Sequence, residues 1–512
     1  MTCVYLDQIH LCLPRILAMY DIDETSDTYG YGDRFYWGWK LIDFPNGTFQ
    51  AVASGFAGLI THNLLPEGIS KDAIIRRIKA IFSATQNQLT KNGSLDEALP
   101  NEASFCVTGL VAADLLLTVE RLDHYIDQTL KHEWLNIIRP MIHFLQIQDE
   151  YHGIISNHLA TNALALVRWS ELSGESSDER AKVWLERIIE NQSEEGWFTE
   201  YNGPDAGYQT WCTSSLAEIH KLRPDWGLTE PLHKSLEFLS YAAHINGSFG
   251  GNYGSRMTRF IFPSGLEALA KEIPTSASLA KFTRTSIRNG TVVNLNTIDP
   301  SNLIPFFNDY VSASITLAKA NKPSSLPLLP YQRGKFRKLW EESGWLVDSS
   351  EEHYSILNLN NGGAGIHTLA TGAENEVCGF VGYKKEKTNL YSTQFIDLES
   401  KWSLDGNTCT VESRLRKVKR QHPSALQFII LRSLCITIFR SMTLGNWVKI
   451  ALVRFLVTRK SRPQGSVFRV ITLGPKLKIT DKSPPTITPI EHRGFKPIHM
   501  ASMGYWQKGD TE

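Results

Sequence analysis

The sequence has no pair of cysteines spaced to hold a metal ion or to build a disulfide framework. Its seven cysteines are scattered, and no CxxC pair occurs; they stand at positions 3, 12, 106, 212, 378, 409 and 435. This spacing argues against a zinc ribbon, an iron–sulfur site and a disulfide-stapled fold. Scattered thiols of this kind fit a reducing compartment.

The sequence also lacks a surplus of charge of either sign. Lys and Arg number 53, Asp and Glu number 53, and the formal net charge is zero. We therefore expect no nucleic-acid partner, although a local basic patch could still meet an anionic polymer. The first fifteen residues contain neither a basic n-region nor a clean apolar segment. We expect no signal peptide and a cytoplasmic location, with export by another route left open.

No hydrophobic run is long enough and free enough of charge to suggest a membrane span. The most apolar stretch, Leu426 to Val457, is interrupted by Arg432, Arg440, Lys449 and Arg454 and by Gly445. Charges at that spacing are costly inside a bilayer. We predict two strands of a β-hairpin for this stretch instead.

What is present is a long series of helical patterns. A chain of 512 residues, 42% apolar and 21% charged, is typical of a folded protein with more than one domain. Inner apolar and outer amphipathic helices alternate, which predicts stacked helical hairpins in an (α/α) toroid over residues 1–320. The expected helices are 4–20, 106–122, 132–145, 157–172, 178–189, 208–221, 232–243 and 265–282.

The periodicity changes to two near residue 340. A Pro-rich linker is expected over 321–345, followed by an antiparallel β-sandwich over 346–512. The fold class is therefore multidomain α + β, with the toroid first. The expected strands are 354–360, 377–383, 434–439, 448–457, 467–473 and 476–481.

Polar residues gather where successive inner helices begin. Asn157 and His158 open one helix, and Tyr208 opens the next inner helix about fifty residues later. The loop containing Tyr253 and Arg256 holds the matching place after a further hairpin. Taken alone, Asn157 could simply cap its helix and His158 could pack. Because inner helices of a toroid present the same end to one cleft, we expect these side chains to converge.

This set of residue types suits β-elimination on a uronate-containing glycan. Asn157 and Arg256 could hydrogen-bond and neutralise the substrate carboxylate, so that charge developing there is stabilised. A base would then take the C5 proton, and an acid would protonate the departing O4. Histidine and tyrosine can fill these roles, so the chemistry requires neither metal nor cofactor.

The chain resembles the heparinase II/III-like polysaccharide lyases, which combine an (α/α) toroid with a β-sandwich. The resemblance rests on Asn157-His158, on Tyr208 at its helix start and on the loop 253–256. In the second half it rests on the motifs at 354–365, 382–394 and 498–506. The family often shows Asn-Asn-His, whereas Ser156 precedes Asn157 here. These lyases commonly work outside the cytoplasm, and the resemblance also allows a subgroup linked to surface polysaccharide metabolism.

The resemblance implies roles for individual residues. Asn157 would neutralise the carboxylate, His158 would be base or helper, and Tyr208 would be general acid and possibly base, with Tyr201 competing for that role. His367 is the candidate for a histidine that some members take from the β domain. We expect an acidic polysaccharide or oligosaccharide as partner. The predicted substrate contacts are Glu200, Tyr201, Asp205, Tyr253, Trp37, Trp211 and His367.

Other functions fit the same sequence. Glu200 and Asp205, or Glu194 and Glu195, could form the acid–base pair of a glycoside hydrolase. A uronyl C5-epimerase would use similar proton abstraction without shortening the chain. A non-catalytic glycan-binding or assembly protein would use the aromatic loop 28–40 and the basic run 414–420 as contact surfaces.

Overall fold

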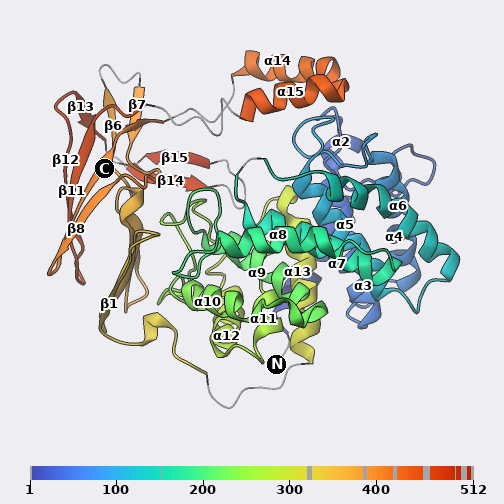
Figure 1. Cartoon of the computed structure of the whole chain (residues 1–512), viewed down its shortest axis with the longest axis horizontal. Coiled ribbons are helices and arrows are strands. Elements are labelled where there is room, and N and C mark those ends of the chain that lie inside the picture. The colour runs from blue at the N-terminus through green and yellow to red at the C-terminus, as the bar shows by residue number, and fades with distance from the viewer. Residues whose placement is uncertain are drawn as a thin grey trace.

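The structure is a computed structural model that describes residues 3–151, 153–319, 326–384, 389–418, 424–453, 462–490, 492–497 and 504–508. Helices fill the first part of the chain and antiparallel strands dominate the second, as Figure 1 shows from blue to red. The predicted fold class is confirmed. Of the motifs quoted above, residues 385–388 and 498–503 lie outside the described residues, as do residues 419 and 420 of the basic run and residues 321–325 of the expected linker.

Six inner helices form a closed ring. Each inner helix packs against the next one along the chain, and the last packs back on the first. They are α3 (Ala53–Thr61), α5 (Phe105–Arg121), α7 (Ser156–Ser173), α9 (Ala206–Leu222), α11 (Ser264–Leu269) and α13 (Pro300–Ala318). Helices α5 and α7 are buried on almost every side, as a helix that is apolar all round must be. This ring confirms the toroid.

Six outer helices cover the ring, and each packs mainly against one inner helix. They are α4 (Lys71–Gln88), α6 (Gln128–Ile147), α8 (Asp178–Glu190), α10 (Thr229–Ser240), α12 (Pro274–Asn289) and α1 (Val4–Leu17), which packs on α13. Outer helices are amphipathic; α8 buries Ala181, Trp184, Leu185 and Ile188, which share one face. Short elements lie between them: α2 (Arg34–Trp37), η1 (Gly47–Val52) and η2 (Pro224–Trp226).

One expected helix, 265–282, is in fact two. Helix α11 ends at Leu269 and α12 begins at Pro274. Proline suits the first turn of a helix, where its missing N–H would have no partner, but it disfavours helical geometry in the residue before it. The apolar periodicity continued across this break, which is why the sequence alone suggested a single helix.

A five-stranded antiparallel sheet forms the middle layer of the molecule. Its strands follow chain order: β1 (Phe336–Trp340), β2 (Trp345–Ser349), β3 (His353–Asn358), β4 (Ala364–Leu369) and β5 (Glu374–Val377). In β2, Trp345 and Val347 belong to the toroid core, whereas Leu346 belongs to the core between the sheets. Both faces are therefore covered. Strand β1 lies inside the stretch expected to be a linker, after the turn η3 (Pro330–Gln332).

Two four-stranded antiparallel sheets complete the β part. One has the order β12-β11-β9-β8 and the other β10-β7-β6-β13. Leu346 and Leu357 of the first sheet share a core with Val411 and Ile471, so the predicted sandwich is confirmed. The strands are β6 (Val381–Lys384), β7 (Asn389–Ser392), β8 (Lys401–Asp405), β9 (Thr408–Arg414), β10 (Arg416–Lys417), β11 (Ser466–Thr472), β12 (Lys478–Lys482) and β13 (Ile487–Pro489), with β14 (His492–Pro497) and β15 (Gly504–Lys508) paired separately.

The hairpin of strands predicted for 426–457 is wrong. Helix α14 (Ala425–Ile436), the turn η5 (Ile438–Arg440) and helix α15 (Met442–Val453) occupy this stretch up to the last residue described. Ser424 and Gln427 form a capping box that starts α14. The periodicity of a short run of Leu and Ile does not distinguish a buried strand from a helix. Here the capping box at Ser424 favours the helix.

Two further expectations have clear outcomes. The strand expected over 377–383 is divided, since β5 ends at Val377 and β6 begins at Val381 in another sheet. All seven cysteines are free thiols in the structure. Within the described ranges, no helix combines the length and the apolar character that a membrane crossing needs.

Candidate active site

The N-terminal ends of α7 and α9 meet beside a short extended segment. Ser156 donates its backbone N–H to the Thr199 carbonyl over 3.1 Å, and Tyr201 donates to the Ile154 carbonyl over 3.0 Å. These bonds hold Glu200 alongside the first turn of α7. Asn157 and Glu200, which are 43 residues apart in the chain, are thereby brought into contact.

Glu200 is the carboxyl group at the centre of this cluster. Its Oε2 accepts a hydrogen bond from Asn157 Nδ2 at 2.7 Å, and its Oε1 lies 3.4 Å from Arg256 Nη1. Burial raises the pKa of Glu200 to about 7, although Arg256, His158 and Asn157 each favour the charged form. A carboxyl with that pKa can take up or release a proton near neutral pH.

Arg256 lies between two tyrosines. Its guanidinium carbon is 4.8 Å from the ring centre of Tyr201 and 4.8 Å from that of Tyr208. Burial raises the pKa of both phenols, and Arg256 offsets only part of that effect. Both tyrosines therefore remain protonated at neutral pH and can donate a proton. Arg256 would stabilise the phenolate that such a donation leaves.

His158 is paired with a carboxylate that the sequence analysis did not select. His158 Nδ1 lies 2.8 Å from Glu150 Oε2. Burial alone lowers the pKa of His158, but Cys106 and Glu150 outweigh burial and raise that pKa well above its usual value. These partners favour the imidazolium form of His158, which disfavours the role of resting base. The signal in the sequence was the Asp149-Glu150 pair shortly before the helix.

Asp205 holds the backbone rather than facing a substrate. It caps α9 by accepting from the Tyr208 N–H at 3.2 Å, and it accepts from the backbone N–H groups of Arg256 at 3.0 Å and Thr258 at 3.3 Å. The Thr258 hydroxyl also donates to it. These donors occupy a carboxylate that is 1% exposed. Asp205 is thus a clamp between α9 and the Arg256 loop, contrary to the predicted substrate contact.

Tyr253 and Trp37 also make contacts other than those expected. Tyr253 is fully buried, with its hydroxyl 3.0 Å from His244 Nε2 and its ring edge-on to Trp345. It supports the interface with the middle sheet and does not line the mouth of the site. Trp37 lies on α2, where its indole N–H donates to the Met19 carbonyl over 2.8 Å.

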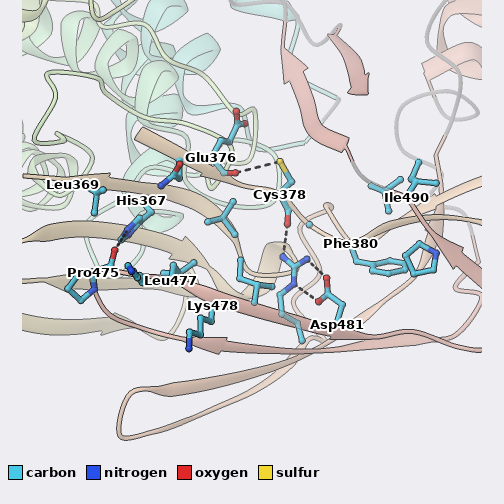
Figure 2. A pocket seen from close by; sticks show the side chains of 18 residues that line it. His367, Leu369, Glu376, Cys378, Phe380, Pro475, Leu477, Lys478, Asp481 and Ile490 are labelled. Atoms are coloured by element: carbon cyan, nitrogen blue, oxygen red, sulfur yellow. Dashed lines mark hydrogen bonds and ion pairs between the residues drawn. The ribbon is translucent and has the colours of Figure 1, made fainter. Parts of the chain in front are cut away.

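Trp211 adjoins the cluster, whereas His367 does not. Trp211 stacks on Tyr208, one turn earlier on α9, and lines a cavity of about 100 Å³ inside the toroid. His367 lies on β4 and lines a separate open pocket of about 1040 Å³ in the β part (Figure 2). Ser355 Oγ lies 2.7 Å from its Nδ1 and the Pro475 carbonyl 3.2 Å from its Nε2, so both ring nitrogens are engaged there.

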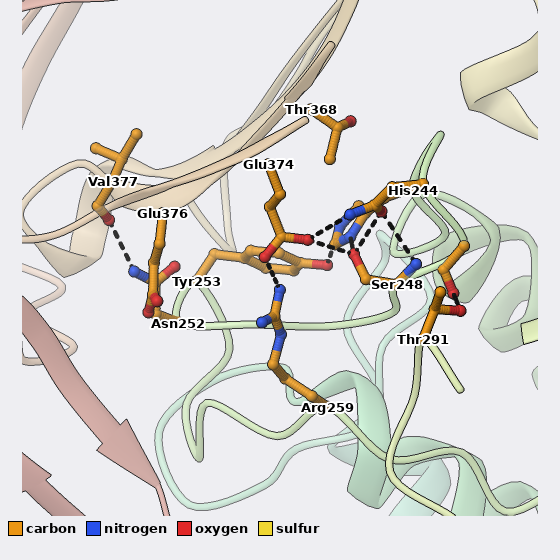
Figure 3. A network of polar contacts seen from close by, with 12 residues as sticks. His244, Ser248, Asn252, Tyr253, Arg259, Thr291, Thr368, Glu374, Glu376 and Val377 are labelled. Carbon is orange, nitrogen blue, oxygen red and sulfur yellow. Dashed lines mark hydrogen bonds and ion pairs between the residues drawn. The ribbon is translucent and has the colours of Figure 1, made fainter. Parts of the chain in front are cut away.

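The β part holds the loop that carries Arg256. Glu374 on β5 accepts from Asn246 at 2.8 Å and from Ser248 at 2.7 Å, and it pairs with Arg259 (Figure 3). Arg259 and these donors outweigh burial and lower the pKa of Glu374. A charged Glu374 thus fastens both ends of the loop to the middle sheet.

Side-chain amides fasten the middle of the same loop. Asn358 donates to the Tyr253 carbonyl over 2.7 Å, and Asn361 donates to the Asn252 carbonyl over 2.8 Å.

Two residues of the site have a left-handed backbone conformation. Met257 has a φ of +57° and Tyr201 a φ of +62°, a region that non-glycine residues rarely occupy. Such backbone conformations persist where surrounding contacts over-determine them, often at functional sites.

No group of three or more His, Cys, Asp or Glu side chains in the described part of the chain is arranged to hold a metal ion.

Of the predicted site residues, the structure brings together Asn157, His158, Glu200, Tyr201, Tyr208 and Arg256, with Trp211 adjoining. Which of these act in catalysis stays a prediction.

No protein-family model matches the sequence, and no curated protein matches it. Among solved structures, the chain is similar to a sugar epimerase from a ruminal bacterium (10% identity, TM-score 0.45, covering 63% of this chain and 100% of the epimerase). It is also similar to a Paenibacillus xanthan lyase (9% identity, TM-score 0.47, covering 81% of this chain and 45% of the lyase). A third similar structure is the Streptomyces coelicolor A3 chondroitin AC lyase (10% identity, TM-score 0.47, covering 81% of this chain and 66% of the lyase). The chain thus spans less than half of the xanthan lyase. Identities near 10% leave the site to be interpreted from its own geometry.

Proposed function

We propose that the protein is a glycan-active enzyme that removes the proton next to a uronate carboxylate and completes a β-elimination. One observation carries this proposal: Glu200 is a buried carboxyl with a pKa of about 7, held by Asn157 and Arg256 beside two tyrosines. A base is most effective when its pKa lies near the working pH. Tuning a carboxyl in this way by burial is a recurring device of acid–base enzymes.

The cations of the cluster favour an anionic substrate. The side chain of His158 is 21% exposed and that of Arg256 is 16% exposed, whereas the side chains of Glu150 and Glu200 are almost fully covered. A substrate therefore meets positive charge first. The Arg256–Glu200 contact is long, at 3.4 Å, so Arg256 is the partner of Glu200 that a uronate carboxylate would most readily recruit.

The proposed reaction uses four groups of the cluster. Glu200 takes the C5 proton while Arg256 and Asn157 stabilise the negative charge that develops on the substrate carboxylate. The C5–H electrons form the C4–C5 double bond as the C4–O4 bond breaks. Tyr208 gives its phenolic proton to O4, and the proton held by Glu200 later restores Tyr208. Tyr201 flanks Arg256 at the same distance and is the competing donor.

This assignment differs from the roles that the family resemblance implied. His158 is an imidazolium that helps attract the carboxylate, and the base is Glu200. The hydrolase alternative built on Glu200 and Asp205 loses its second carboxylate, because Asp205 accepts hydrogen bonds from Tyr208, Arg256 and Thr258. An epimerase would share the proton abstraction and differ in keeping the C4–O4 bond.

The test is the ultraviolet absorbance of the C4–C5 unsaturated uronate over a panel of uronate polysaccharides. Wild type should give the signal, and Glu200→Gln and Tyr208→Phe should each lose it by about 10²-fold or more. Tyr310→Phe is the matched control, since Tyr310 is a buried tyrosine of α13 whose hydroxyl has no hydrogen-bond partner in the described structure. That variant should keep wild-type activity.

Three results would contradict elimination. Shorter chains without unsaturated product would indicate hydrolysis. Exchange of the C5 hydrogen with solvent deuterium, at constant chain length, would indicate epimerisation. Binding of the polysaccharides without any turnover would indicate a non-catalytic glycan-binding protein.

A further inference from the structure

The helical hairpin made of α14, η5 and α15 carries an unusual concentration of exposed apolar side chains. Of the 23 large hydrophobic side chains that are exposed in the described structure, eight lie between residues 426 and 447. They are Leu426, Phe428, Ile429, Ile430, Ile436, Ile438, Leu444 and Trp447, of which Trp447 is 72% exposed. A folded protein does not present such a cluster to water without a partner.

Part of the hairpin docks on the toroid. Phe439 and Cys435 are buried, Asn101 Nδ2 donates to the Phe439 carbonyl over 2.8 Å, and Arg432 pairs with Asp43 at 2.8 Å. These contacts fix the hairpin beside α2, as Figure 1 shows. Around these contacts the hairpin keeps eight large apolar side chains exposed.

The aromatic loop near the N-terminus adds to the same region. Trp39 is 66% exposed, and Phe35 and Leu41 are also exposed. They immediately precede Asp43, the partner of Arg432 on α14. The Asp43–Arg432 pair thus brings the end of this loop against α14, although the two segments are far apart in sequence.

Charge in this segment has one sign only. Residues 424–453, which make up the hairpin, contain no Asp or Glu and three cations, Arg432, Arg440 and Lys449. Arg432 pairs with Asp43, a carboxylate from outside the hairpin. Arg440, between the two helices, is exposed. In a chain whose net charge is zero, this is a strong local imbalance.

We propose that the hairpin and the aromatic loop bind the surface of an anionic lipid bilayer. Exposed Leu, Ile, Phe and Trp on short helices, combined with Lys and Arg and no acids, are the features of a segment that lies in the membrane interface. Helix α14, with 12 residues, is roughly 18 Å long, against a hydrocarbon thickness of about 30 Å, so it lies along the surface.

Lipid explains the two features together better than the other occupants do. A second copy of the chain would bring the same positive charge against this face and be repelled. An acidic glycan would satisfy the charge, but it has no use for an aliphatic face of Leu and Ile. A bilayer with anionic headgroups satisfies both the charge and the apolar side chains.

The experiment is flotation of the full chain with vesicles of phosphatidylcholine alone or of equimolar phosphatidylglycerol and phosphatidylcholine. Wild type should float with the anionic vesicles, less with the neutral ones, and less as salt is raised. The triple variant Leu426→Ser, Ile429→Ser and Trp447→Ser should lose at least tenfold in bound fraction. The matched control Leu11→Ser, Val183→Ser and Leu398→Ser replaces exposed apolar residues elsewhere and should float as wild type does.

A charge pair of variants separates the electrostatic part. Arg440→Glu should weaken binding to anionic vesicles, whereas Arg288→Glu, at the exposed end of α12, should not. Failure of the wild type to float with anionic vesicles at low salt would overturn the proposal, as would equal flotation of the two triple variants. Light scattering that shows a dimer, abolished by the hairpin triple variant, without vesicle binding would assign the face to a second copy and also overturn it.

Discussion

Asn157 donates from Nδ2 to Oε2 of Glu200 over 2.7 Å, and this contact joins the first turn of α7 to the segment that leads into α9. The donor favours the charged form of Glu200, yet burial raises its pKa to about 7. The carboxyl is thus poised between its two protonation states at neutral pH, and its titration should be visible in both activity and stability.

The first prediction concerns the dependence of rate on pH. If Glu200 is the base, kcat/KM should rise about tenfold per pH unit below pH 7 and level off above about 7, where Glu200 is ionised. Burial raises the pKa of Tyr208, so loss of its proton should cause no decline up to about pH 10. Initial rates of uronate elimination across this range provide the measurement. A rise in kcat/KM centred near pH 4 would exclude Glu200 as the base.

The second prediction concerns stability. The folded pKa of Glu200 is raised above its unfolded value of about 4.3, so the native state holds a proton that the unfolded chain releases. Ionising Glu200 therefore costs native stability as the pH rises from about 4.3 through about 7. Glu200→Gln cannot ionise, and its free energy of unfolding relative to wild type should improve by up to about 3 kcal/mol between pH 4 and pH 8.

Denaturant titrations of both proteins at several pH values would measure this difference. The matched variant Glu267→Gln alters another buried carboxyl, one that pairs with Arg284 and accepts from Tyr5. That variant controls for the removal of a buried carboxyl as such. A difference between wild type and Glu200→Gln that is constant with pH would contradict the raised pKa.

The third prediction concerns Asp205. Asp205→Ala removes a helix cap and leaves the buried N–H groups of Arg256 and Thr258 without their acceptor, so it should destabilise the fold by about 3–5 kcal/mol. Asp299 caps α13 by accepting from Ser301 and Asn302, and Asp299→Ala should cost only about 1 kcal/mol. Thermal and denaturant unfolding compare the two. Equal losses would show that Asp205 is no more than a cap.

The fourth prediction concerns the tie between Glu374 and the Arg256 loop. Glu374→Ala leaves Arg259, Asn246 and Ser248 without their shared acceptor, and it should lower kcat/KM by freeing the loop. Arg259→Ala should act through the same contact, so the double variant should lose less than the sum of the single losses. Amide hydrogen exchange over residues 246–259 should accelerate in each. Unchanged exchange with lost activity would contradict a positioning role.

The toroid could be predicted because inner and outer helices leave different patterns in the sequence. Helices α5 and α7 are apolar nearly all round, whereas α8 has a single apolar face. The hairpin at 425–453 could not be predicted in the same way, since eight of its large apolar side chains are exposed and few of its described residues are buried. Its capping box at Ser424 was the one local sign of a helix.

The convergence of the candidate residues could be predicted from helix order, whereas the direction of individual side chains could not. Asn157, Tyr208 and Arg256 converge because inner helices begin at the same end of the ring. Asp205 and Tyr253 belong to the same motifs, but the direction of their side chains is set by hydrogen bonds to Thr258 and His244, which no spacing reveals. The proton affinity of Glu200 comes from burial, which is likewise a property of the assembled fold.

The amides of Asn358 and Asn361 reach from the middle sheet to the backbone of the Arg256 loop. The position of Arg256 therefore depends on both the helical part and the β part of the chain. Exchanging the β part for that of another protein would keep every residue of the helical cluster. It would nevertheless remove the contacts that position the Arg256 guanidinium. A functional chimaera would have to retain Asn358 and Asn361 together with the loop to which they donate hydrogen bonds.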